Sequence, residues 1–287
     1  MSRIAFVTDT SCNLPEELVQ QYSITVVPLY VIFGTRSYKD YVEMPPAEFY
    51  RRLAEDKAAG LGMPKSSQPS PEDFRAVYAA LAAQGYTDII SIHVTAKSSG
   101  TCQSAQLAAS MLDQVRVHVV DSGTTSMQMD FMLFEAVDTV RAGGGVAEAI
   151  AAIEHVKERS SLYFTVTEVE HLAASGRTEG AEKVTEAAVS VKPIVGVLEG
   201  VPKAVGAERS QRAALQKVVE FIAERKGDRQ LKRLAIVNGN VPDRAAQWSQ
   251  EVSQALNFSG QPFIVDFGPA LAVHFGPGLL GIAAQWE

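Results

Sequence analysis

The sequence predicts an α/β protein whose first half contains a mostly parallel β-sheet. Short apolar runs alternate with amphipathic helical patterns up to about residue 142, and this alternation is typical of βαβ units. The chain is 287 residues long, a length that favours two modest domains or one large α/β domain. After the glycine run at residues 142–145 the pattern changes. We therefore expect a second α/β unit, with a boundary between residues 142 and 160.

The expected strands of the first half are short and apolar. They cover residues 4–7, 88–93 and 115–120, and an apolar stretch rich in valine and isoleucine covers residues 24–33. Buried parallel strands have this continuous apolar character. Two amphipathic helical patterns, MPPAEFYRRLAED and SPEDFRAVYAALAAQG, have proline near their starts. The segment between them, GLGMPKSSQPSP, is predicted to be a loop.

Polar segments follow the expected parallel strands where each strand ends. These segments are TDTSC, TAKSSGT and DSGTTS, all rich in hydroxyl groups and small residues. The carboxyl ends of parallel strands meet at one edge of a sheet, and ligands usually bind there. The sequence therefore predicts a binding site formed by these segments.

The second half has a different order of elements. After a helix over residues 146–158, SLYFTVTE predicts a strand and EHLAASG a short helix ending at Gly176. VKPIVGVLEGVPKAVG predicts a hairpin that turns at Glu199 and Gly200. The remaining pattern predicts helices over residues 209–226 and 242–256, and strands over residues 233–238 and 262–265.

Composition excludes several classes of protein. The net charge of −7 argues against binding to nucleic acid or to an anionic membrane surface. Cys12 and Cys102 have neither the spacing of a disulfide framework nor that of a zinc site, and no histidine pair has metal-ligand spacing. The N-terminus lacks the features of a signal peptide, and no apolar run is long enough to span a bilayer. We expect a cytoplasmic protein without a metal or cofactor.

Serine-containing loops are the first candidate binding groups. In KSSGT, residues 97–101, Ser99 and Gly100 lie between a strand and a helix, where first-turn N–H groups attract an anion. The same serine and threonine types also cap helices without any ligand. Ser66 and Ser67 in PKSSQPSP offer further hydroxyl groups, although serine beside proline is also ordinary turn chemistry.

Arg177 and His274 are the candidate groups of the second half. Arg177 follows the expected helix end, where a guanidinium either satisfies the last helix carbonyls or pairs with a carboxylate or phosphate. His274 lies in GPALAVHFGPGLLGI, where glycine and proline predict irregular backbone. It is either a core histidine bonded to carbonyls or a ligand-binding group. His93 and His118 fit strand ends, and His155 and His171 lie in polar helical patterns.

Two further hypotheses remain open from the residues alone. The methionine-rich stretch SMQMDFMLF, residues 126–134, is either core packing or the lining of an apolar channel. Ser99 as nucleophile, His274 as base and Asp9 or Asp121 as orienting group would make a serine hydrolase, if the fold brings them together. The sequence contains no GxSxG elbow and no Walker loop.

The ordered set of phrases in the chain resembles the bacterial DegV family of fatty-acid-binding proteins, which includes the binding subunits of fatty acid kinase. The resemblance covers nearly the whole chain. The matching phrases are VTDTSCNLP at residues 7–15, VPLYVIFG at 27–34, PKSSQPSP at 64–71, SSGTCQSA at 98–105, VVDS at 119–122, LAASGR at 172–177, VKPI at 191–194 and HFGPGLLGI at 274–282.

This resemblance implies both a fold and a function. It implies a three-layer α/β/α domain with a mainly parallel sheet over residues 1–157 and an α/β domain with a mixed sheet over residues 158–287. A long-chain fatty acid would lie between them, presented to a separate ATP-dependent kinase that forms the acyl phosphate, so the chain itself would not be an enzyme. The carboxylate ligands that the resemblance implies are Ser66, Ser99, Arg177 and His274, with N–H groups near Gly100, while Arg209 would meet the kinase.

The sequence also departs from the family pattern. Ser66 replaces the usual threonine, which retains the hydroxyl group and loses a methyl group. The phrase after VVDS is normally glycine-rich, whereas here it is TTSMQMD, so the shape of the tunnel is expected to differ. A further alternative is the substrate-holding half of a dihydroxyacetone-type kinase, which resembles DegV proteins in fold and would hold a small polar ligand.

Overall fold

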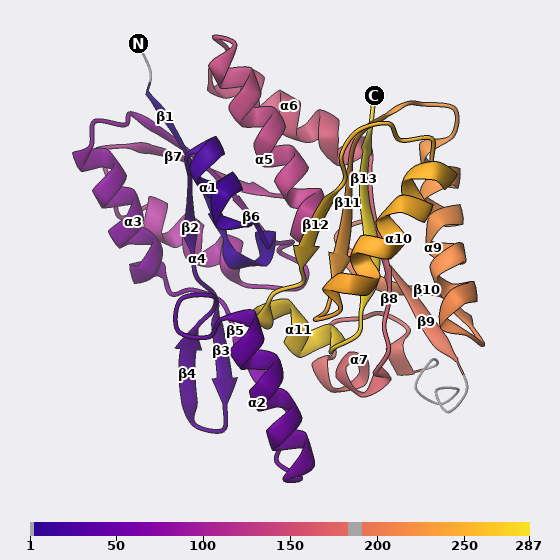
Figure 1. Ribbon diagram of the computed structural model, residues 1–287. Helices are drawn as coiled ribbons and strands as arrows, with labels where there is room; N and C mark the ends of the chain where they lie inside the picture. The colour runs from indigo at the N-terminus through magenta and orange to yellow at the C-terminus, as the bar shows by residue number, and fades with distance from the viewer. Residues whose placement is uncertain (1–2, 183–190) are drawn as a thin grey trace.

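The protein is built from two large sheets with helices between and around them. The structure, a computed structural model, describes residues 3–182 and 191–287. Figure 1 shows the parallel sheet of the first half at the left and the mixed sheet of the second half at the right. The helices α5 (Ser126–Arg141) and α6 (Val146–Glu158) lie between them.

The first half forms the predicted parallel sheet, with the strand order β2-β1-β6-β7. Its strands are β1 (Ile4–Asp9), β2 (Ile24–Val27), β6 (Asp88–His93) and β7 (Arg116–Asp121). Helices α3 (Pro71–Ala83) and α4 (Thr101–Ala109) cover one face. Helix α1 (Glu16–Tyr22) covers the other face together with α5 and α6. The expected three-layer α/β/α arrangement is confirmed.

The second half forms a mixed sheet with the strand order β10-β9-β8-β13-β11-β12. The pairs are antiparallel except for β11 with β12, which is parallel. The strands are β8 (Ser160–Thr165), β9 (Lys192–Leu198), β10 (Val201–Glu208), β11 (Leu231–Asn238), β12 (Phe263–Asp266) and β13 (Leu280–Trp286). Helices α9 (Gln211–Lys226) and α10 (Pro242–Ala255) pack on its outer face. The predicted hairpin turns at Glu199 and Gly200, both with positive φ, as a tight hairpin turn requires.

A small antiparallel sheet was not predicted. It has the order β4-β3-β5 and consists of β3 (Tyr30–Phe33), β4 (Arg36–Lys39) and β5 (Lys65–Ser67). Helix α2 (Pro46–Ala58) packs against it. The expectation that Ser66 and Ser67 lie in a loop is therefore wrong. Ser66 pairs with Val31 of β3, and this pairing between distant segments makes a strand of a stretch that has turn-forming residues.

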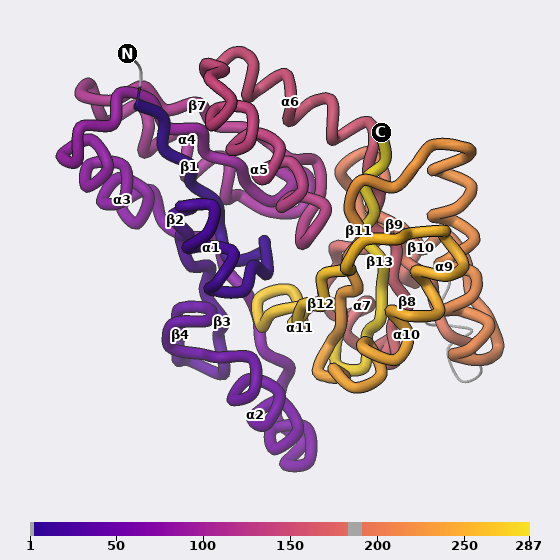
Figure 2. Tube along the Cα trace, turned by 45° about the horizontal axis from the view of Figure 1, so that its top comes forward, coloured from indigo at the N-terminus to yellow at the C-terminus, as the bar shows by residue number. Residues whose placement is uncertain are grey.

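Two short helices complete the region between the sheets. Helix α7 (Val169–Ser175) ends at Gly176, which has a φ of 62°, as predicted. Helix α11 (Pro269–Phe275) contains His274 in its last turn, so the expectation of irregular backbone at this histidine is wrong. Proline at the first helical position starts α11 and Gly276 ends it. Figures 1 and 2 both show α11 between the two halves of the molecule.

The hydrophobic core is continuous from the first half to the second. One cluster contains Phe6 and Ile90 of the parallel sheet, Phe134 of α5, and Phe164 and Val237 of the mixed sheet. Helix α5 is buried on nearly every side because it packs against both sheets. The domain division between residues 157 and 158 stays a prediction.

The described ranges contain neither a membrane-spanning helix nor a cluster of metal-binding side chains. None of the helices within residues 3–182 and 191–287 has the length and apolar character needed to cross a bilayer. In the same part of the chain, no group of three or more His, Cys, Asp and Glu side chains is placed to hold a metal ion.

Candidate ligand-binding site

A cavity of about 210 Å³ lies between the two halves of the molecule, at the carboxyl ends of β1 and β6. Segments from all three predicted strand exits reach its wall, at Ser11, Ser98 to Gly100, and Thr125. The expectation that these exits share one edge is thus confirmed. In the order β2-β1-β6-β7, the chain adds β2 on one side of β1 and then adds β6 and β7 on the other side. Parallel sheets usually bind ligands at the point where the strand order changes in this way, here between β1 and β6.

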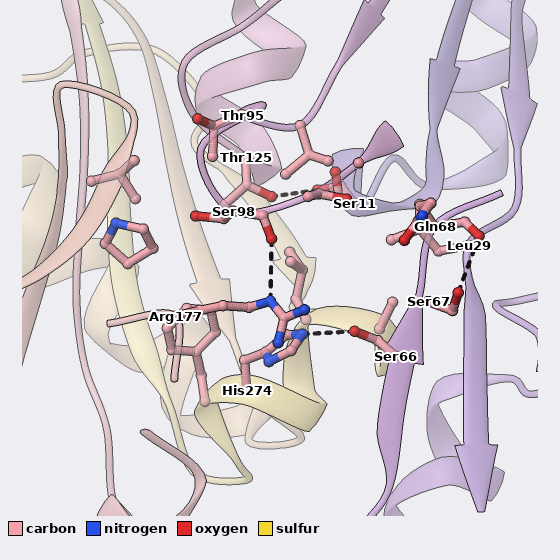
Figure 3. Close-up of a pocket in the computed structure, with 18 residues that line it drawn as sticks. Ser11, Leu29, Ser66, Ser67, Gln68, Thr95, Ser98, Thr125, Arg177 and His274 are labelled. Atoms are coloured by element: carbon pink, nitrogen blue, oxygen red, sulfur yellow. Dashed lines mark hydrogen bonds between the residues drawn. The ribbon is translucent and has the colours of Figure 1, made fainter. Parts of the chain in front are cut away.

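All of the candidate carboxylate ligands line this cavity. Figure 3 shows Ser66 and Ser67 on one side, Arg177 and His274 on the other, and Ser98 above them. The polar wall consists of Ser11, Ser66, Ser67, Gln68, Thr95, Ser98, Ser99, Gly100, Thr125, Arg177 and His274. The apolar wall consists of Leu29, Val94, Val197, Pro202, Ala270, Leu271 and Phe275.

His274 is the most buried polar group of the head-group cluster, which we define as Ser66, Ser99, Gly100, Arg177 and His274. Its Nε2 lies 2.7 Å from the Ser66 hydroxyl, and its Nδ1 has no hydrogen-bond partner among the described residues. Burial, followed by electrostatic repulsion from Arg177 and His171, lowers the pKa of His274 to about 3. The imidazole is therefore neutral near pH 7, with one donor and one acceptor nitrogen.

His171 holds the helix that carries His274. Its Nδ1 donates a hydrogen bond of 3.0 Å to the Val273 carbonyl, and its ring lies 2.7 Å from where a Cβ on Gly276 would stand. The sequence placed His171 in a polar helical pattern, but the side chain is buried. No sequence signal distinguished it, since its partner is more than a hundred residues away.

Arg177 has the first of the two roles that the sequence allowed, since it bonds to a carbonyl at the end of the preceding helix. Its Nη1 donates to the Ser175 carbonyl at the end of α7, and its Nε donates to the Ser98 carbonyl across the cavity, both at 3.1 Å. The guanidinium therefore joins the second half of the chain to the exit of β6. Arg177 remains exposed and has no carboxylate partner among the described residues. It can accordingly pair with an anionic ligand.

Ser99 and Gly100 form the start of α4. The Ser99 hydroxyl bonds to the Thr101 hydroxyl at 2.8 Å and accepts a hydrogen bond from the Thr101 N–H at 3.3 Å. This is the capping role that the sequence left open. Gly100 precedes the first helical residue, so the positive end of α4 faces the cavity wall.

Ser11 and Thr125 also line the cavity, and sequence reasoning did not single them out as binding groups. Thr125 donates to the Ser11 carbonyl at 3.2 Å, and the Ser11 hydroxyl donates to Asp9. Asp9 also accepts hydrogen bonds from the Val94 N–H and from His93 Nδ1. The predicted strand-exit segments contain Ser11 and Thr125, but the two residues are far apart in sequence. Only the folded structure shows that they meet.

The arrangement needed for a serine hydrolase is not formed. Ser99 pairs with Thr101, and His274 pairs with Ser66. Asp9 is engaged by His93, while Asp121 accepts from the N–H groups of Ala96 and Gly123. The described residues therefore do not support the hydrolase hypothesis, because none of its three groups is hydrogen-bonded to another.

Two other candidates lie away from the cavity. Arg209 follows β10 and is exposed. The side chains of Met127, Met129 and Met132 are fully buried in the core and do not line the cavity. Core packing is therefore what the structure shows for the methionine-rich stretch.

The fold and the site can be compared with known proteins. The family model described as "Uncharacterised protein, DegV family" matches residues 3–287. The chain belongs to the DegV family. A DegV domain-containing protein of Deinococcus radiodurans is 33% identical over 285 residues, covering 98% of each chain.

Solved structures of DegV proteins have the same fold. One, described as fatty acid binding of a DegV family protein from Thermus thermophilus, is 30% identical, has a TM-score of 0.87 and matches 99% of this chain and 100% of its own. DegV of Bacillus subtilis, described as a fatty acid binding protein, is 27% identical with a TM-score of 0.89 and full coverage of both chains. The structural relatives of this chain are thus DegV proteins that bind fatty acids.

Proposed function

We propose that this protein binds a long-chain fatty acid, with the carboxylate in the head-group cluster and the acyl chain against the apolar wall. The main support for this proposal is that Ser66, Arg177 and His274, which are distant in sequence, line one cavity. The same cavity has an apolar wall. The fatty-acid-binding DegV relatives support the same ligand class. We propose no metal or cofactor.

The cluster has the groups that a buried carboxylate needs. An ionised carboxylate taken out of water is costly unless it is hydrogen-bonded and paired. Arg177 supplies a charge-assisted donor, the neutral His274 supplies one N–H, and the start of α4 supplies a favourable dipole. The acyl chain contributes most of the affinity, since a chain of about sixteen carbons, at about 0.8 kcal/mol for each buried methylene group, offers roughly 10 kcal/mol before association and ordering costs.

The proposed role is that of a carrier for a separate kinase. The sequence has no Walker-type phosphate-binding loop, and in the proposed role a second protein would hold the phosphoryl donor. The carboxylate would then attack the γ-phosphate, and Arg177 together with His274 would stabilise the added negative charge of the acyl phosphate. The exposed Arg209 is the proposed contact with that kinase.

Native mass spectrometry of freshly purified protein tests the ligand. We expect a bound mass of about 250 to 285 Da, the range of fatty acids with sixteen to eighteen carbons, in the wild type and a reduced bound fraction in Arg177→Ala. Arg212→Ala, which changes an exposed arginine away from the cavity, is the control. A small polar ligand, or retention that Arg177→Ala leaves unchanged, would contradict the proposal.

Arg209→Ala tests the kinase contact separately. We expect normal fatty acid retention, because Arg209 does not line the cavity, together with a higher protein concentration for half-maximal acyl phosphate formation by a bacterial fatty acid kinase. Equal kinase turnover for wild type and variant at every concentration would remove Arg209 from the interface.

A further inference from the structure

Helix α5 contains a carboxyl group that has no partner among the described residues. Asp130 is fully buried, and neither of its carboxyl oxygens has a hydrogen-bond partner in the ranges 3–182 and 191–287. Burial, followed by repulsion from Asp9, raises the pKa of Asp130 well above its usual range. This shift favours the protonated carboxyl group, which has one donor and one acceptor.

A second orphan oxygen lies on the same face of α5. The Ser126 hydroxyl is fully buried and has no partner in the described part of the chain. Ser126 and Asp130 are four residues apart, which places them one above the other on the helix. Ser126 also has a φ of 55°, a strained backbone conformation for a residue with a side chain. Such features persist at binding sites because a ligand compensates for them.

This polar pair adjoins two residues of the cavity wall. Thr125 and Ser11, which bond to each other in the cavity wall, are followed in sequence by Ser126 and Cys12. The Cys12 thiol is buried and close enough to Asp130 for the carboxyl to raise its pKa. Helix α5 packs against the short helix Thr10–Cys12. Ser126 is thus the chain neighbour of one wall residue, and Asp130 lies near Cys12, the chain neighbour of another.

The acyl chain needs more room than the cavity has. Sites for small molecules usually have volumes of about 300 to 1,000 Å³, whereas this cavity has about 210 Å³. Its wall residues Val197, Leu271 and Phe275 belong to the same hydrophobic core as Cys12 and Met129. An acyl chain longer than this cavity would extend into that core, to which the α5 neighbours of Asp130, Met129 and Phe131, also belong.

We propose that the fatty acid bound by this protein has an oxygen substituent part-way along its chain, a hydroxyl or keto group, and that Asp130 and Ser126 are its hydrogen-bond partners. The inference rests on the proposed function. An unsubstituted chain would leave both orphan groups unpaired, whereas a hydroxyl group would accept from the Asp130 carboxylic acid and donate to the Ser126 oxygen.

Displacement of a fluorescent fatty acid tests this inference. The probes are stearic acid and a positional series of monohydroxystearic acids. We expect one isomer to bind the wild type about tenfold more tightly than stearic acid does, which is the effect of one satisfied buried hydrogen bond. Equal affinity for stearic acid and for every isomer would overturn the inference and leave the proposed function standing. Absence of binding for stearic acid and for every isomer would overturn both.

Variants of Asp130 and Ser126 test which side chain recognises the oxygen substituent. Asp130→Val should bring the affinity ratio close to one while stearic acid still binds, and Asp130→Asn, which retains a donor and an acceptor, should preserve the preference. Thr165→Val is the matched control, because Thr165 is fully buried outside the cavity wall and its hydroxyl has no partner within residues 3–182 and 191–287. A preference that survives Asp130→Val would overturn the assignment. If Asp130→Val does not fold, Ser126→Ala provides the same comparison, and an undiminished preference there would also count against the pair.

Discussion

His274 is neutral because the protein surrounds it with apolar groups and with a cation. An imidazolium at this position would lose its hydration and face Arg177. A neutral imidazole instead exchanges one hydrogen bond with Ser66 and leaves its second nitrogen for a ligand. Arg177 therefore supplies the positive charge of the head-group cluster. His274 supplies a neutral hydrogen-bond donor, held in place by its bond to Ser66.

The buried imidazole makes the stability of the ligand-free protein depend on pH. The pKa of His274 is about 3 in the folded state and 6.5 as the ordinary value, so only the unfolded chain takes up a proton as the pH falls from 6.5 toward 3. Stability should therefore decrease over that window. At pH 5 the loss is about 2 kcal/mol.

Urea unfolding of the ligand-free protein at pH 7 and pH 5 checks this pH dependence. We expect His274→Gln to lose less stability between the two pH values than the wild type does. His155→Gln, at an exposed position of α6, should behave as the wild type. An identical loss in His274→Gln and in the wild type would show that this histidine does not titrate as described.

Helix α11 positions the imidazole, and the residues at its end determine where it lies. Gly276 ends the helix with a φ of 72° and a ψ of 178°, a conformation essentially restricted to glycine. His171 packs against this glycine and bonds to the last turn of the helix. A change at Gly276 therefore acts on His274 without touching the ligand.

Gly276→Ala should weaken both folding and ligand binding. The new Cβ would lie 2.7 Å from the His171 ring, and the strained backbone adds to the clash, so we expect about 2 kcal/mol of lost stability. The measurements are urea unfolding and fatty acid affinity. Gly34→Ala is the control, since Gly34 has a φ of 59° but no neighbour within 4 Å, and affinity should remain normal there. Unchanged affinity in Gly276→Ala would refute the positioning role of this end of α11.

The molecule as a whole is held together by the α5 layer, which packs against both sheets. Phe134 shows the connection, because its ring stacks on Tyr22 of α1 at 4.2 Å and contacts Phe263 of β12 at 5.9 Å between ring centroids. Because the two halves share this core, we expect them to unfold as one unit.

Phe134→Ala should lower the stability of both halves together. The cavity costs about 3 to 5 kcal/mol, which corresponds to a decrease of about 10 °C in Tm. We expect calorimetry to show one transition at the lower temperature, and Leu107→Ala, at an exposed position of α4, to leave Tm nearly unchanged. Two separate transitions in Phe134→Ala would contradict a shared core.

The parts of the fold that the sequence predicted are those specified by local patterns. The buried strands β1 and β6 are continuous apolar runs, and the turn at Glu199 and Gly200 uses residues that suit a positive φ. The shared position of the strand exits could be predicted because parallel strands end at one edge of the sheet. The family resemblance then named Ser66, Ser99, Gly100, Arg177 and His274 as ligand groups, and the fold brings all of them to one cavity.

The remaining features depend on contacts between distant segments, so no local pattern could reveal them. β5 has only three residues and exists because β3 pairs with it. The bond between Ser66 and His274 joins residues 208 positions apart, and His171 acquires its role only when α7 and α11 pack together. Periodicity along a chain reflects local backbone geometry. The packing of one segment on another decides which polar groups meet, and which, like Asp130, have no partner in the described part of the chain.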